Sequence, residues 1–156
     1  MAGSGEPNPI EHIAGRDVVL GDSRALTAGG RVLSALVLFL VLLQAALAGQ
    51  FLYRDHGLVS AHRIVGEIVP VAAAGLVGVT RLLYRHDDGV RNFWVASAVL
   101  FVLVIAQTGL GFIGRTNTMA SAMHIPLGVA LFGLATYTTL LAWRRSAPQS
   151  PSSHQS

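Results

Sequence analysis

Four long apolar runs, separated by short polar stretches, dominate the chain. The runs occupy Val32–Tyr53, Ala61–Tyr84, Phe93–Gly114 and Ala122–Trp143. Each has about 22 residues, and at about 1.5 Å per residue a helix of that length covers about 33 Å, enough to cross the hydrocarbon core of a bilayer. Short connections force consecutive helices to run antiparallel. The pattern therefore predicts an all-α, integral membrane four-helix bundle with up-down-up-down topology over residues 31–145.

The two ends of the chain lack this pattern. Residues 1–30 are polar and glycine-rich with no sustained apolar period, so we predict a flexible cytoplasmic tail, with a short surface helix over Ile10–Leu20 as an alternative. Residues 146–156 consist mainly of Ser, Pro and Gln, which predicts a second, disordered cytoplasmic tail.

The composition supports a membrane protein and narrows its chemistry. Of 156 residues, 52% are hydrophobic and only 12% are charged, whereas soluble domains carry about 25% charged residues. The absence of cysteine excludes disulfides, thiolate metal sites and covalent attachment of a c-type haem. The net charge of +3 does not indicate a nucleic-acid partner, because the basic residues flank the apolar runs, as a lipid bilayer requires.

The distribution of arginine predicts the orientation in the plasma membrane, because short cytoplasmic segments carry the excess of basic residues. One side holds both termini and the second connection, and it has eight arginines against three on the other side. The eight are Arg16, Arg24, Arg31, Arg81, Arg85, Arg91, Arg144 and Arg145, and the three are Arg54, Arg63 and Arg115. We therefore predict a multi-pass protein with both termini in the cytoplasm.

The two halves of the chain resemble each other. Each predicted hairpin has a glutamine in its first helix and a histidine near the start of its second, with glycine four residues after the histidine. The positions are Gln44, His62 and Gly66 in the first half, and Gln107, His124 and Gly128 in the second. The pattern indicates two pseudo-repeated helical hairpins that place both histidines at the same depth near the outer surface.

The histidine pair is the main candidate site. In an up-down bundle the second and fourth helices lie diagonally, about 12–14 Å apart given the usual spacing of neighbours. Two inward imidazoles then leave a gap of about 4 Å, which suits a metal ion about 2.0 Å from each nitrogen. We therefore predict that His62 and His124 are the axial metal ligands of a haem b. The alternative is that both histidines are ordinary interfacial residues.

Five further residues are predicted to contact this cofactor. Gly66 and Gly128 lie one turn inside the histidines and would clear space for the plane of the haem. Arg63 and Arg115 lie near the outer face and would pair with the propionates. Gln107 is a mid-membrane amide for which we consider a ligand contact, although an interhelical hydrogen bond is the more usual role.

Glu67 is the only acidic residue inside an apolar run. A buried charge in a membrane is costly, so such residues are functional candidates. We consider two roles for Glu67, a catalytic proton relay to the bound ligand and an i,i+4 ion pair with Arg63.

The chain resembles one four-helix half of the haem A synthase family over about residues 31–145. The similarity rests on His62-Arg63 at the start of the second helix, on Gln107 with Leu110-Gly111, and on His124-Ile125-Pro126-Leu127. By this resemblance His62 and His124 would be axial haem ligands. The chain departs from the family in having one bundle, Val59-Ser60-Ala61 in place of the expected acid, and no cysteine pair in an outer loop.

These observations define three functional hypotheses. The first is a membrane haem-b protein that transfers electrons to a redox partner, or handles haem, near the outer face. The second is a non-redox membrane protein, either a transporter subunit or a scaffold for a partner. The third is a haem-modifying oxidoreductase assembled as a homodimer of two half-size bundles.

Overall fold

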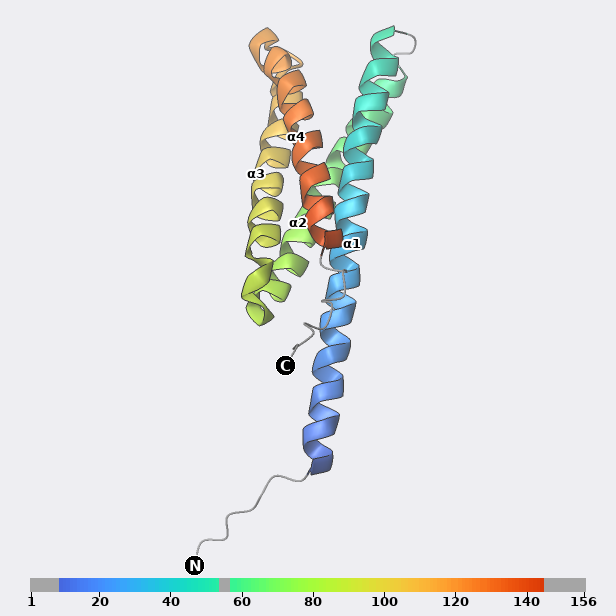
Figure 1. The fold of residues 1–156 in the computed structure, drawn as a ribbon. Helices are drawn as coiled ribbons and strands as arrows, with labels where there is room; N and C mark the ends of the chain where they lie inside the picture. Colours follow the sequence, from blue (N-terminus) through green and yellow to red (C-terminus); the bar gives the residue numbers. More distant parts are fainter. Residues whose placement is uncertain (1–8, 54–56, 145–156) are drawn as a thin grey trace, which may run out of the picture.

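The computed structural model describes residues 9–53 and 57–144, and it describes side chains for residues 23–50 and 57–144. Its elements are α1 (Pro9–Tyr53), α2 (Leu58–His86), the short 3-10 helix η1 (Asp88–Val90), α3 (Arg91–Ile113) and α4 (Thr118–Arg144), as Figure 1 shows. All four α-helices contain segments long and apolar enough to cross a membrane. The predicted all-α membrane bundle is therefore confirmed.

The first helix begins much earlier than its apolar run. It starts at Pro9, a residue type that suits the first turn because its missing N–H needs no partner there. Leu26 packs against the hydrophobic core, and a Cβ built on Gly30 would lie 3.2 Å from the ring of Phe93. Residues 23–30 thus belong to the bundle, although they were predicted as part of a flexible tail. Residues 1–8 and the predicted second tail lie outside the described residues.

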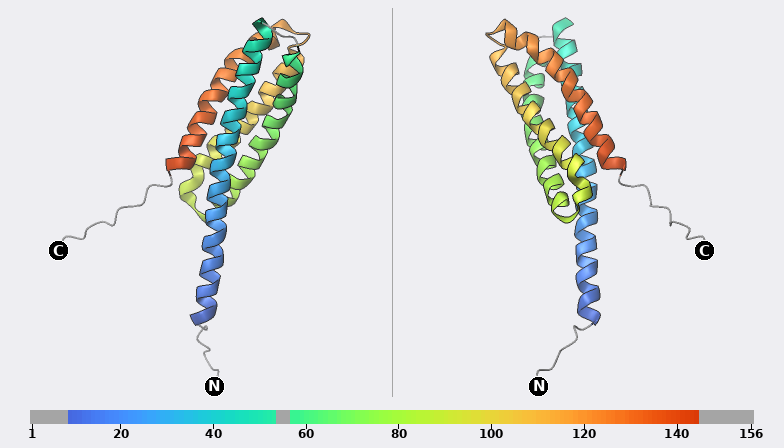
Figure 2. Two further views of the ribbon diagram at one scale, coloured as in Figure 1. Left: turned by 90° about the vertical axis from the view of Figure 1, so that its right-hand side faces the viewer. Right: turned by 60° about the vertical axis from the view of Figure 1, so that its left-hand side comes forward.

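The helices follow the predicted up-down-up-down order. α1 packs against α2 and α4, and α3 packs against the same two helices, so that α2 and α4 occupy diagonal positions. The start of α1, the end of α4 and the α2–α3 connection lie toward one end of the molecule (Figures 1 and 2). We call this the terminal end, and we call the opposite end, with the α1–α2 and α3–α4 connections, the histidine end.

The buried core is concentrated toward the terminal end. Among the described residues of 41–68 none is buried, and among residues 105–130 only Ala120 is. The larger buried apolar side chains are Val37, Leu40, Val69, Leu76, Leu83, Val90, Phe93, Leu100, Val104 and Leu131. Figure 1 shows the consequence, since the α1–α2 and α3–α4 hairpins lie together at the terminal end and diverge toward the histidine end.

Polar contacts join the two hairpins at the terminal end. The hydroxyl of Thr139 donates a hydrogen bond of 3.1 Å to the carbonyl of Ser34, and Arg31 Nε donates one of 3.4 Å to the carbonyl of Ala142. The guanidinium of Arg31 also lies 5.6 Å from the ring centroid of Trp143. These contacts fix α4 against α1 where the core is best packed.

Aromatic and basic side chains gather near the α2–α3 connection. Tyr84 and Trp94 stack with ring centroids 5.4 Å apart. The guanidinium of Arg81 lies 5.6 Å from the first ring and 5.5 Å from the second. Tyr and Trp combined with basic residues are typical of a membrane–water interface.

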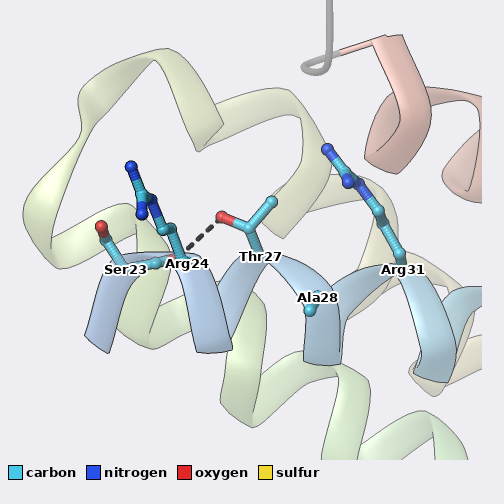
Figure 3. A pocket seen from close by; sticks show the side chains of 5 residues that line it. All are labelled: Ser23, Arg24, Thr27, Ala28 and Arg31. Carbon is cyan, nitrogen blue, oxygen red and sulfur yellow. Dashed lines mark hydrogen bonds between the residues drawn. The ribbon is translucent and has the colours of Figure 1, made fainter. Parts of the chain in front are cut away.

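A pocket lies on the part of α1 near the terminal end (Figure 3). Its lining consists of Ser23, Arg24, Thr27, Ala28 and Arg31. The Thr27 hydroxyl donates a 2.8 Å hydrogen bond to the carbonyl of Ser23. Both arginines lie on the same side of α1 in Figure 3, and seven residues correspond to nearly two helical turns. The pocket places positive charge at the end of the molecule that the arginine count predicts to be cytoplasmic.

The stability of the bundle should depend on its terminal half. Leu76 is fully buried, whereas Val102 on α3 is 63% exposed. We expect Leu76→Ala to cost about 2–5 kcal/mol, because it leaves a cavity between packed helices. Val102→Ala should cost less than about 0.5 kcal/mol, because the Val102 side chain is exposed and its truncation leaves no cavity in the core. Reversible unfolding in mixed micelles would measure both values, and equal losses would contradict this description of the core.

Candidate functional site

The two predicted ligand histidines lie close together at the histidine end. His62 is on α2 and His124 is on α4, and both are half-buried. Their ring centroids are 6.4 Å apart and their ring planes are inclined by 68°. The structure therefore brings together two imidazoles from diagonal helices. The backbones of these two helices do not come close to each other within the described part of the chain.

Each imidazole is held by a reciprocal pair of contacts with a glutamine of the neighbouring helix. In the first hairpin, Gln44 Nε2 donates to the carbonyl of His62 at 2.8 Å, and His62 Nδ1 lies 3.2 Å from the carbonyl of Gln44. In the second, Gln107 Nε2 donates to the carbonyl of His124 at 2.9 Å, and His124 Nδ1 lies 3.2 Å from the carbonyl of Gln107. The interhelical hydrogen bond considered for Gln107 is thus confirmed. Gln44 makes an equivalent bond, so the sequence repeat has a structural counterpart.

These contacts determine which ring nitrogen carries the proton. A carbonyl oxygen can only accept a hydrogen bond, so Nδ1 must be the protonated nitrogen of each neutral ring. The lone pair is then on Nε2 of both His62 and His124. Donation of one ring N–H to a backbone carbonyl is the usual way in which a metal-binding histidine is oriented. Both side chains are therefore prepared to act as neutral nitrogen donors.

The distance between the two ring centroids can be compared with that of a metal ion held by two imidazoles. Metal–imidazole bonds are about 2.0–2.1 Å long and the ring centre lies about 1.1 Å beyond the nitrogen, so a metal bound to two opposed imidazoles holds the centroids about 6.3 Å apart. The observed 6.4 Å is close to this value. Among the described residues, however, no group of three or more His, Cys, Asp or Glu side chains could hold a metal ion. Two nitrogens suffice only where a macrocycle such as porphyrin supplies the other donors.

The amide oxygens of the two glutamines add a second symmetric feature. Gln44 Oε1 and Gln107 Oε1 are buried and have no hydrogen-bond partner within the described part of the chain. Their orientation is fixed, because each Nε2 must face a carbonyl. A buried acceptor without a donor is costly in an apolar environment. Both repeats thus leave the same acceptor atom without a donor among the described residues.

The glycines one turn inside the histidines accommodate these glutamines. A Cβ built on Gly66 would lie 2.9 Å from Gln44 Nε2, and one built on Gly128 would lie 3.2 Å from Gln107 Nε2. The immediate neighbour of each glycine is therefore a glutamine amide. The predicted role of clearing space for a cofactor plane stays a prediction. The two glycines thus leave room for the amides that hydrogen-bond to the backbone carbonyls of the histidines.

The other predicted site residues lie apart from the histidine pair. Arg63 and Glu67 are exposed on α2. Glu67 follows His62 by five residues, which rotates it about 140° around the helix. Arg115 is exposed in the α3–α4 connection, where its guanidinium lies 5.6 Å from the ring centroid of Phe112. Neither role considered for Glu67 has a matching contact, because no hydrogen bond or ion pair joins it to a described residue.

Two residues have a larger part in the site than the sequence indicated. Gln44 makes the same contacts as Gln107, and the shared spacing from glutamine to histidine is the signal that predicts this equivalence. Gly111 allows the ring of His124 to approach α3, because a Cβ there would lie 3.0 Å from His124 Cε1. The equivalent position in the first hairpin is Ala48, so the sequence offers no repeat signal for Gly111.

The chain was compared with protein-family models, with curated proteins and with solved structures, and none of the three comparisons gave a match.

Proposed function

We propose that this chain is a haem-b protein of the plasma membrane, with His62 and His124 as axial ligands and both termini in the cytoplasm. Its role would be electron transfer to a redox partner, or haem handling, near the outer face of the membrane. The observation that carries the proposal is the symmetric pair of imidazoles, each with Nδ1 at a backbone carbonyl and with centroids 6.4 Å apart.

The packing of the bundle supports the same proposal. The histidine end has almost no buried side chains among its described residues, although its residues are largely apolar. A haem would cover these residues and supply the missing packing. When bound, the haem would supply a redox-active iron. The chain's own contribution would be to fix two neutral imidazoles and to surround them with apolar side chains.

Arg115 and Arg63 are the proposed partners of the haem propionates, which are anionic. Arg115 is the better placed of the two by its position at the histidine end, and its contact with Phe112 keeps its charged group near the surface. Arg63 is exposed on α2, so its contact with a propionate would require the side chain to reach around the helix.

The resemblance to one half of a haem A synthase supports haem ligation by the same two histidines. It supports haem modification less well, because the acid before His62 is replaced by Val59-Ser60-Ala61 and Glu67 is on the far side of α2. A proton relay to the ligand would need a carboxylate close to the site. We therefore propose binding and electron transfer as the function of this single bundle.

The proposal predicts a coloured protein. Protein purified from cells supplied with haem should show a Soret band, and a sharp α-band after reduction, as expected for low-spin iron with two histidine ligands. Pyridine extraction should give one haem b per chain. A folded, monodisperse and colourless preparation that also fails to take up added haemin would contradict the proposal and would favour a non-redox scaffold or transporter subunit.

A further inference from the structure

Glu67 presents a carboxylate on the membrane-facing side of α2. It follows Leu58, the first residue of α2, by nine residues, which is about 14 Å along the helix. Its neighbours on this side are apolar and exposed, with Ile64 at 56% and Val71 at 72%. Ionisable residues within membrane segments normally face the bundle interior or pair with another group, because exposure of a charge to lipid is costly. Glu67 does neither among the described residues.

Arg63 lies on the same side of α2, one turn nearer the histidine end, and is also exposed. Neither Arg63 nor Glu67 makes a hydrogen bond or ion pair with any described residue. One face of α2 thus carries a positive and a negative side chain, and neither has a partner among the described residues. A surface with this property is complementary to a copy of itself related by a two-fold axis, since each charge meets its opposite in the other copy.

The same face has the spacing of a helix–helix contact. Exposed residues recur at intervals of seven along two rows, the first comprising Ser60, Glu67 and Ala74, and the second comprising Ile64, Val71 and Gly78. An interval of seven residues keeps such a stripe facing a parallel neighbouring helix. Small residues at Ala74 and Gly78 permit close approach in a membrane, and a Cβ built on Gly78 would meet nothing within 4 Å.

We propose that this face of α2 binds a second copy of the chain, with Arg63 of each copy paired to Glu67 of the other. In a parallel pair the two residues differ by four positions, about 6 Å in depth, a distance that the long side chain of arginine spans. The interface lies on the opposite side of α2 from the histidine pair, so the dimer does not depend on haem binding.

The absence of cysteine from the chain makes a direct test available. Residues near a two-fold axis meet their own counterparts, so single variants Ala74→Cys and Gly78→Cys should form disulfide-linked dimers when membranes are oxidised with copper phenanthroline. Val102→Cys on α3 and Val129→Cys on α4 serve as matched controls, because both side chains are more than 60% exposed, at 63% and 69%, but lie on other helices. These controls should remain monomeric.

Charge reversal tests the pairing itself. In the Ala74→Cys background, Glu67→Arg or Arg63→Glu places like charges opposite one another, and each should reduce the cross-linked dimer about tenfold or more. The double variant Arg63→Glu with Glu67→Arg restores the opposite pairing and should restore the dimer. The far-UV circular dichroism spectrum of each variant should stay unchanged, which shows that the bundle is still folded. Equal cross-linking of variants and controls, adducts with other proteins only, or a double variant that behaves like the single ones would each overturn the proposal.

Discussion

Replacement of either His62 or His124 by alanine is expected to abolish stable haem binding. Loss of residues that merely orient a metal ligand typically lowers metal affinity about 10- to 100-fold, so loss of a ligand itself should cost about 100-fold or more. The symmetry of the site, in which the two imidazoles make equivalent contacts, predicts similar losses for the two variants. The measurement is the ratio of Soret to protein absorbance, supported by extracted haem per chain.

The matched control for this experiment is His86→Ala. His86 is the last residue of α2 and is exposed, so its replacement should leave the haem content unchanged. Addition of imidazole to His62→Ala or His124→Ala should partly restore the low-spin spectrum, because the small molecule can supply the missing nitrogen. A variant that keeps the wild-type spectrum, or a folded variant that never responds to imidazole, would contradict ligation by that residue.

Much of the fold followed from the length of the apolar runs and from the short connections between them. About 22 apolar residues predict a membrane span wherever they occur, and short loops leave only antiparallel neighbours. The diagonal placement of α2 and α4 follows from that order. The residue at which α1 begins could not be predicted in this way, because residues 9–30 are too polar to continue the apolar pattern of the first membrane segment.

The inward and outward faces of the helices were harder to predict. In a soluble protein the polar side of a helix identifies the solvent face, but lipid and protein core are both apolar, so this contrast is lost. Glu67 illustrates the difficulty. The sequence placed it five residues from a predicted ligand and inside a membrane segment, and both facts favoured a role at the site. Only the structure reveals that it is exposed on α2, away from the imidazoles.

The equivalent placement of His62 and His124 was predictable because its signal is a repeat. The spacings of 18 residues from Gln44 to His62 and 17 from Gln107 to His124 identify equivalent positions without any knowledge of the helix faces. The function of Gly66 and Gly128 was not predictable in the same way. A glycine in the sequence shows only that a side chain is absent. The sequence does not show which group of another helix lies in the space that this leaves.

Replacement of Gly66 by leucine should therefore disrupt the site through its glutamine. A Cβ at Gly66 would lie 2.9 Å from Gln44 Nε2, so the new side chain must displace this amide from the carbonyl of His62. Overpacking of this kind costs about 1–3 kcal/mol, and the lost hydrogen bond adds about 0.5–1.5 kcal/mol. Since Gln44 also supplies the carbonyl that orients His62 Nδ1, we expect a lower unfolding temperature and weaker haem retention together.

Gly133→Leu is the control that separates a steric effect at the site from a general effect of leucine. A Cβ built on Gly133 would meet nothing within 4 Å, and the residue is exposed on α4. Leucine there should be neutral or stabilising, because leucine has a better helix propensity than glycine by somewhat less than about 1 kcal/mol. Thermal unfolding and haem dissociation into an acceptor protein would measure both variants. If Gly66→Leu behaved like Gly133→Leu, the glutamine would not be the group that positions His62, and the symmetric contacts would be a consequence of helix packing.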